Sequence, residues 1–111
     1  MLFRFEEIQK ALGGTFLNEP HGEGVDSVTT DTRAITPNSL FIALSGERFD
    51  GHDFLDAALK QGASLLCIER AKLAKLPAGA PAIAVDSTVA AYQALARFHR
   101  MRLPVKAIAL T

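Results

Sequence analysis

Five consecutive apolar residues, LFIAL at positions 40–44, constrain the fold of this chain more than any other stretch. Turn residues precede the run: Pro37 presets φ at one turn position, and Asn38 tolerates the geometry of the next. A polar loop follows at residues 45–52. An uninterrupted apolar run of strand length between such boundaries is typical of a strand that is covered on both faces. We therefore expect a buried strand here, in the middle of the stretch DTRAITPNSLFIALSGERFDGHDF at residues 31–54.

A second apolar run, SLLCIE at residues 64–69, follows a segment with helical spacing. We expect this helix to begin near Asp53 and to end at Gly62. Its apolar side consists of Phe54, Leu55, Ala58 and Leu59. The order strand, helix, strand predicts a right-handed parallel crossover, and a third short buried strand is predicted at residues 82–85. The chain is therefore predicted to be a layered α/β domain.

The rest of the chain supplies two more helices and further strands. Apolar residues at i, i+3 and i+7 predict an amphipathic helix over residues 5–12. A longer helix, which Asp86 or Ser87 caps, is predicted to run to about residue 101, and residues 70–81 are expected to be a connector. Strands are predicted at residues 15–17, 25–30 and 105–111. Because the last of these stops without a following turn, we expect the chain to be part of a larger protein.

Composition narrows the classes of partner. Basic and acidic residues balance to a formal net charge of zero, so the chain has no field strong enough to gather nucleic acid or an anionic membrane. No stretch approaches the roughly 20 apolar residues that a spanning helix needs, and residues 1–12 interleave charges with apolar residues, unlike a signal peptide. We expect a cytoplasmic protein that binds a specific small molecule or protein.

Cysteine and histidine offer no sign of a metal or disulfide site. The single cysteine, Cys67, excludes an intramolecular disulfide, and its place in an apolar strand predicts a small core residue. His21, His52 and His99 have no ligand-like spacing, either among themselves or with the cysteine. We therefore predict no metal site.

Polar, charged and aromatic side chains crowd the loop GERFDGHD at residues 46–53. In an open α/β sheet this is the edge where ligands bind, and free N–H groups at a helix start favour an anion. Upstream, Asp31, Thr32 and Arg33 offer a carboxylate, a hydroxyl and a guanidinium that could hydrogen-bond to a phosphorylated ligand. The alternative is a structural loop in which Asp50 and Asp53 only cap backbone groups. No GxGxxG or GxxxxGK[ST] motif is present, so the residues form no recognisable ATP site.

The run VTTDTRAITPNSLFIALSGERFDGHDF, followed by AALKQGASLLCIE, resembles the N-terminal domain of the Mur ligases, which add amino acids to the peptidoglycan precursor. The family pattern is D-[ST]-R, a turn, an LF-[IV]-A-L strand, G-E-x-x-D-G-H-[DE]-F, a helix and G-A. The resemblance continues through VDSTVAAYQALARFHR and is strongest to the MurF type, the UDP-N-acetylmuramoyl-tripeptide:D-alanyl-D-alanine ligases. Asn38 and Ser39 stand where the family often has Gly-Asp, which changes the turn and leaves the site untouched.

The resemblance implies a layered α/β/α domain with a small mixed sheet at residues 1–85, which holds the UDP end of the substrate. Residues 86–111 would be the first helix and strand of a central ATPase domain. A complete enzyme of this type uses ATP and Mg²⁺ to phosphorylate the peptide's terminal carboxylate, and the amine of D-alanyl-D-alanine then attacks the acyl phosphate. The implied partners are UDP-N-acetylmuramoyl-tripeptide and D-alanyl-D-alanine. The chain alone, as a monomer or an edge-paired dimer, is expected to bind UDP weakly, to bind neither ATP nor Mg²⁺, and to catalyse nothing.

The resemblance also implies roles for single residues. Thr32 matches the Ser/Thr whose hydroxyl lies near the diphosphate. Three residues match the triplet that lies along the uracil: Glu47, Arg48 and Phe49. Six more match the motif as supporting residues that hold the two loops in register: Asp31, Arg33, Gly46, Asp50, Gly51 and His52. Two alternatives stay open, namely a MurE-type ligase, which adds the third residue of the peptide, and a stand-alone nucleotide-binding module.

Overall fold

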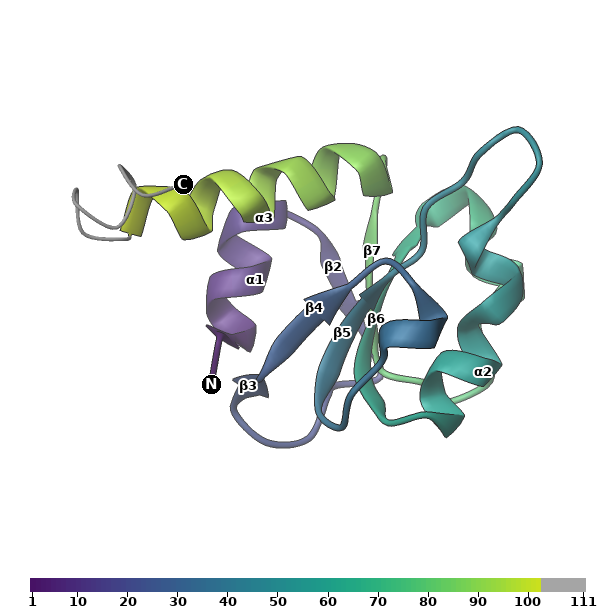
Figure 1. Cartoon of the computed structure of the whole chain (residues 1–111), viewed down its shortest axis with the longest axis horizontal. Helices are drawn as coiled ribbons and strands as arrows, with labels where there is room; N and C mark the ends of the chain where they lie inside the picture. The colour runs from purple at the N-terminus through teal and green to yellow at the C-terminus, as the bar shows by residue number, and fades with distance from the viewer. Residues whose placement is uncertain (103–111) are drawn as a thin grey trace.

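The computed structural model describes residues 1–102, which form three α-helices, three short 3-10 helices and seven strands (Figure 1). The helices are α1 (Phe5–Leu12), α2 (Leu55–Lys60) and α3 (Thr88–Arg102), and the 3-10 helices are η1 (Thr32–Ala34), η2 (Gly51–Phe54) and η3 (Arg70–Lys75). The strands are β1 (Phe3–Arg4), β2 (Thr15–Leu17), β3 (Gly24–Val25), β4 (Ser27–Thr29), β5 (Ser39–Ile42), β6 (Ala63–Glu69) and β7 (Ala82–Val85).

Five of these strands form one mixed sheet in the order β2-β7-β6-β5-β4. Strands β4 to β7 run parallel, and β2 pairs antiparallel with β7 at one edge. Helix α2 connects β5 to its parallel neighbour β6, as the predicted crossover requires. The α/β class and the mixed sheet are therefore confirmed.

The central strands are buried on both faces, as their apolar runs predict. Alternate residues of a strand point to opposite faces, so Leu40 and Ile42 lie in one apolar cluster while Phe41 and Ala43 lie in the other. Helices α1 and α3 cover the first face and α2 covers the second (Figure 1). This is the layered α/β/α arrangement, and each fully buried large side chain in it contributes about 1.5–3 kcal/mol.

The single strand predicted at residues 25–30 is wrong. Strand β3 pairs antiparallel with β1 in a separate two-stranded sheet, whereas β4 joins the main sheet. The break falls at Asp26, whose backbone N–H donates to the carbonyl oxygen of Asn38 at 2.8 Å. Both halves have strand-type composition, so the local pattern could not reveal that they belong to different sheets.

The helix predicted from Asp53 begins later, at Leu55. The residues before it form η2, which Asp50 caps by accepting the backbone N–H of His52. Consequently Phe54, which was predicted on the apolar side of the helix, is 39% exposed.

Helix α3 agrees with its prediction. The Ser87 hydroxyl caps it by accepting the N–H of Ala90 at 3.2 Å, and Ala91 and Leu95 are buried in the cluster that α1 shares.

The division of the chain at residue 85 stays a prediction, and the strand predicted at residues 105–111 lies outside the described residues. Among residues 1–102, none of the helices combines the length and the apolar character that crossing a membrane requires.

Candidate functional site

Two loops that follow neighbouring parallel strands meet at one edge of the main sheet. The first follows β4 and contains η1, and the second spans residues 45–50 after β5 and rises beyond the sheet in Figure 1. Between them lies an open hollow of about 660 Å³. It is lined by Thr30, Asp31, Thr32, Arg33, Leu44, Ser45, Gly46, Phe49 and Phe54. Its place at the carboxyl ends of parallel strands, and its size, are those of a ligand site.

The first loop is held by its own side chains. Asp31 caps η1, with Oδ1 accepting the backbone N–H of Arg33 at 2.8 Å. The guanidinium of Arg33 pairs with the same carboxylate, Nη2 to Oδ2, at 2.9 Å. These side-chain and backbone hydrogen bonds hold the pKa of Asp31 below its ordinary value, and the carboxylate raises the pKa of Arg33. The Arg33 side chain is still 88% exposed, so an anion in the hollow could reach it.

The second loop is closed by backbone hydrogen bonds. The N–H of Gly46 donates to the Phe49 carbonyl oxygen at 2.6 Å, and the N–H of Gly51 donates to the Leu44 carbonyl oxygen at 2.7 Å. A Cβ on Gly51 would lie 2.9 Å from the Leu44 nitrogen and 3.0 Å from the Ala43 Cα. The base of this loop therefore has room only for glycine.

A half-exposed aromatic pair forms one wall of the hollow. The rings of Phe49 and Phe54 stack with centroids 5.3 Å apart and planes at 16°, and Phe49 is 50% exposed. Such a pair offers an apolar face to a planar ring. Glu47 and Arg48, which the resemblance places beside Phe49, are exposed and lie outside the lining of the hollow.

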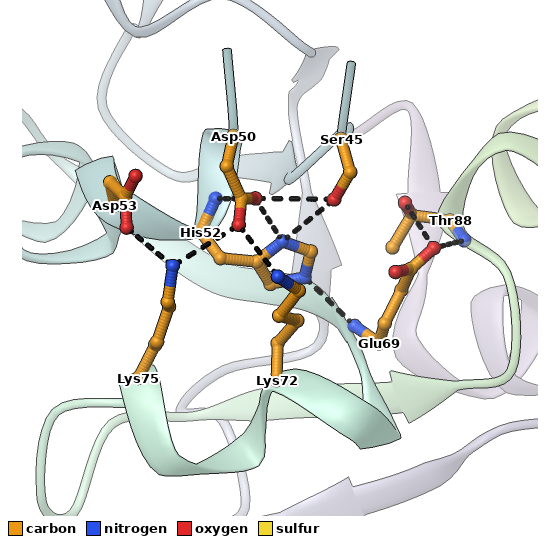
Figure 2. Close-up of polar contacts among 8 residues, drawn as sticks. All are labelled: Ser45, Asp50, His52, Asp53, Glu69, Lys72, Lys75 and Thr88. Carbon is orange, nitrogen blue, oxygen red and sulfur yellow. Dashed lines mark hydrogen bonds and ion pairs between the residues drawn. The ribbon is translucent and has the colours of Figure 1, made fainter. Parts of the chain in front are cut away.

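A buried polar network ties the second loop to the sheet (Figure 2). His52 is 1% exposed. Its Nδ1 lies 2.7 Å from Asp50 Oδ1, and its Nε2 accepts the backbone N–H of Glu69, on β6, at 3.0 Å. Because Nε2 accepts, the proton of the neutral ring sits on Nδ1, from which it donates to Asp50. The Glu69 carboxylate in turn accepts the N–H of Thr88 at 3.2 Å, which links β6 to the start of α3.

Asp50 is the centre of this network. Its Oδ1 also accepts the backbone N–H of His52 at 3.0 Å and the Ser45 hydroxyl at 3.2 Å. Its Oδ2 lies 3.1 Å from Lys72 Nζ and 3.2 Å from Lys75 Nζ. Burial raises the pKa of the Asp50 carboxyl, but the hydrogen bonds from His52 and the lysines outweigh it and hold that pKa well below the usual range.

The structure brings together most of the predicted site residues, and four residues that sequence reasoning did not single out line the hollow or contact Asp50. Ser45, Phe54, Lys72 and Lys75 were not predicted. Phe54 was assigned to the core because it fits the helical spacing of the residues after it. The lysines lie on η3, in the segment expected to be a connector, and the backbone is kinked at Lys72, so no regular spacing in the sequence marked them as neighbours.

Cys67 is a core residue, as predicted. It is fully buried, and burial raises the pKa of its thiol to about 12, so very little thiolate exists at neutral pH. Within residues 1–102, no three His, Cys, Asp or Glu side chains converge as ligands of a metal ion.

Sequence comparison relates the chain to ligases of the peptidoglycan precursor. The model of the "Mur ligase family, catalytic domain" matches residues 24–107. The UDP-N-acetylmuramoyl-tripeptide–D-alanyl-D-alanine ligase of Escherichia coli (strain K12) is 45% identical over 87 residues, which cover 78% of this chain and 18% of that protein. The ligase of the same name from Bacillus subtilis (strain 168) is 35% identical over 107 residues, which cover 96% of this chain and 23% of that protein. A UDP-N-acetylmuramoyl-L-alanyl-D-glutamate–2,6-diaminopimelate ligase of Lactiplantibacillus plantarum is 33% identical over 93 residues, covering 84% and 17%. The chain spans about a fifth of the length of these curated relatives.

Solved structures give the same relationship. Crystal structure I of MurF from Acinetobacter baumannii superimposes with a TM-score of 0.76 at 25% identity, covering 90% of this chain and 21% of that one. MurF from Thermotoga maritima, solved in complex with ADP, superimposes with a TM-score of 0.54 at 31% identity, covering 69% and 16%. The fold, the match over residues 24–107 and the sequence identities agree that the chain belongs to the Mur ligase family.

Proposed function

We propose that this chain holds the UDP end of UDP-N-acetylmuramoyl-tripeptide for a MurF-type ligase. The observation that carries the proposal is that Thr32 and Phe49, from two different loops, line the same hollow. A diphosphate needs hydrogen-bond donors, and a pyrimidine is a planar ring that stacks on aromatic faces. A hydroxyl on one wall and an exposed aromatic ring on another therefore suit the two ends of a UDP group.

We assign the phosphate end to Thr32 and Arg33. Thr32 lines the hollow, and its hydroxyl can donate a hydrogen bond. Asp31 engages Nε and Nη2 of the Arg33 guanidinium, and this leaves further N–H donors on a side chain that is mostly exposed. Guanidinium groups bind phosphate oxygens through paired hydrogen bonds. Asp31 would thus act by holding the guanidinium beside the diphosphate.

We assign the base end to Phe49, which is the more exposed member of the aromatic wall. Glu47 and Arg48 lie outside the lining, so they would form the outer rim of this end. Gly46 and Gly51 support the loop through their backbone hydrogen bonds.

We place the chemical steps of the ligase outside this chain. The Thermotoga maritima relative was solved with ADP, which supports ATP as the nucleotide of the complete enzyme. The sequence has no GxxxxGK[ST] motif, and residues 1–102 contain no group of three His, Cys, Asp or Glu side chains placed to hold a metal ion. We therefore expect the chain alone to form no ADP, and D-alanyl-D-alanine to bind elsewhere in the enzyme.

We also propose a cytoplasmic location for the protein. Light scattering would distinguish a monomer of the chain from an edge-paired dimer.

Titration of the ¹⁵N-labelled chain with UDP tests the assignment. We expect amide shifts to cluster at Thr32, Gly46 and Phe49. A Thr32→Val variant should bind about tenfold more weakly, because a hydrogen bond to a charged group contributes about 1.5 kcal/mol or more. Thr15→Val is the matched control, since Thr15 is exposed on β2 and away from the hollow. Saturating UDP that leaves these amides unmoved, or equal affinities for the two variants, would show that the site is assigned wrongly.

A MurE-type ligase is the second candidate, because the Lactiplantibacillus plantarum relative is named for the addition of 2,6-diaminopimelate. The hollow does not discriminate between the MurF and MurE types, since the substrates named for both begin with UDP. Identity of 45% against 33% favours the MurF type. Assay of the complete ligase with D-alanyl-D-alanine and with diaminopimelate as competing amines would decide between them.

A further inference from the structure

Segment η3 (Arg70–Lys75) directs two lysines at the base of the 45–50 loop (Figure 2). Lys72 and Lys75 both reach Asp50 Oδ2, and Lys75 also reaches Asp53 Oδ1 at 2.6 Å. The lysine side chains are 36% and 39% exposed, whereas Asp50 is 16% exposed. The two ion pairs are thus partly shielded from solvent, where salt screens them less than fully exposed pairs.

The two oxygens of Asp50 divide their partners between two parts of the chain. Oδ1 accepts hydrogen bonds from Ser45 and His52, at the two ends of the loop. Oδ2 takes the ammonium groups of η3. One carboxylate therefore joins the ends of the loop to each other and to a segment more than twenty positions later in the chain.

Few other contacts hold the loop. Residues 45–49 are all exposed, so the loop has little apolar burial of its own. Its other ties are the bridge between Ser45 and Asp50, the stack of Phe49 on Phe54, and two backbone hydrogen bonds, from Gly46 to Phe49 and from Gly51 to Leu44. A segment of this kind opens locally at small energetic cost unless polar contacts at its base restrain it.

We propose that Lys72 and Lys75 are positioning residues that clasp the 45–50 loop in the arrangement in which Phe49 lines the hollow. Neither lysine lines the hollow itself, so their effect on a ligand passes through the loop. The identity of the ligand rests on the proposed function, whereas the clasp is a property of the unliganded chain.

The test needs variants that change charge and little else. Lys72→Met with Lys75→Met removes both ammonium groups and keeps the apolar stems, and the double arginine variant restores the positive charges. Lys60→Met is the matched control, because Lys60 pairs with Asp56 at 3.0 Å on the exposed surface of α2. Thermal unfolding checks that each variant is folded. If the double methionine variant is unfolded, the single variant Lys72→Met is measured in its place, because Lys72 Nζ lies 3.1 Å from Asp50 Oδ2.

Hydrogen exchange of the unliganded chain tests the clasp directly. The amides of Gly46, Gly51 and His52 should exchange about three- to tenfold faster in the double methionine variant, as expected for the loss of two partly exposed ion pairs. Exchange of the β6 amides should not change, and the arginine variant should restore slow exchange in the loop. Equal loop exchange in the double methionine variant and in Lys60→Met would overturn the proposal.

Binding of UDP and of uncharged uridine, followed by NMR shifts, shows how the lysines act on a ligand. A clasp that acts through the loop weakens both ligands by a similar factor of about three to ten. If only UDP binds more weakly, the lysines act on the diphosphate through their electrostatic field. The proposal that they act on the ligand by clasping the loop is then wrong. If the unsubstituted chain binds neither ligand, the proposed function fails, and hydrogen exchange alone still decides for or against the clasp.

Discussion

Replacement of His52 by phenylalanine should strongly destabilise the fold, because the ring is buried and both its nitrogens are hydrogen-bonded. Phenylalanine keeps the planar shape and leaves the N–H of Glu69 without an acceptor, which costs about 1–3 kcal/mol. Asp50 loses one charge-assisted hydrogen bond, worth about 1.5 kcal/mol because its other donors remain. The sum is about 2.5–4.5 kcal/mol out of the roughly 5–15 kcal/mol expected for a domain. At about 4 °C per kcal/mol, the melting temperature should fall by about 10–18 °C.

Two further variants separate the bonds of His52. In His52→Gln the amide oxygen can occupy the place of Nε2 and accept from Glu69, so only the donation to Asp50 is lost, at about 1–1.5 kcal/mol. In His52→Asn the amide nitrogen can replace Nδ1, but the Glu69 N–H loses its acceptor and a cavity remains, at about 2–3 kcal/mol. Urea denaturation followed by circular dichroism measures all three free energies of unfolding.

The proton position is a direct check on the same reasoning. ¹⁵N spectra of the His52 ring should show Nδ1 protonated and Nε2 as an acceptor. A proton on Nε2 would refute the proposed bridge to β6. So would a loss below about 1 kcal/mol in His52→Phe, since a buried N–H without an acceptor cannot cost so little.

Three more outcomes follow from the same contacts. Gly51→Ala should destabilise the chain by about 1–3 kcal/mol, because the added Cβ would meet backbone atoms at 2.9–3.0 Å. Gly46→Ala should be tolerated, because the nearest atom to its Cβ would lie at 3.6 Å. Equal losses of unfolding free energy for the two variants in urea denaturation would contradict this. The lowered pKa of Asp50 means that the unfolded state binds more protons at acid pH, so the stability that Asp50 contributes is complete above its ordinary range near about 4 and is lost as pH falls below it. The stability gap between the unsubstituted chain and Asp50→Asn should therefore shrink on acidification, and a constant gap would count against the role of the carboxylate. The thiol of Cys67, with its pKa raised to about 12 by burial, should react with a disulfide reagent only after denaturation; rapid reaction of the folded chain would show that the site is open.

Sequence patterns predicted the parts of the fold that burial determines. The LFIAL run between turn signals predicted a strand that is covered on both faces, because a strand with one solvated face would alternate apolar and polar residues. Pairing partners were beyond local patterns: Val25 pairs with Phe3, and Ser27 pairs with Ser39. Periodicity indicates which face of a strand is apolar, but it does not indicate which sheet the strand joins.

The candidate site was predictable to a similar extent. Thr32 and Phe49 meet because β4 and β5 are parallel neighbours, so the loops after them open on the same edge. Lys72 and Lys75 reach Asp50 because β6, which η3 follows, pairs with β5. That neighbourhood depends on the order of strands in the sheet, which no motif in the sequence states.

The structure of the chain with bound UDP tests the central claim most directly. We predict the diphosphate within hydrogen-bonding distance of the Thr32 hydroxyl and the pyrimidine against the ring of Phe49. A nucleotide bound instead in another hollow, such as the one that Phe3 and Tyr92 line beside α3, would contradict the account, as would an empty hollow in crystals grown at saturating UDP.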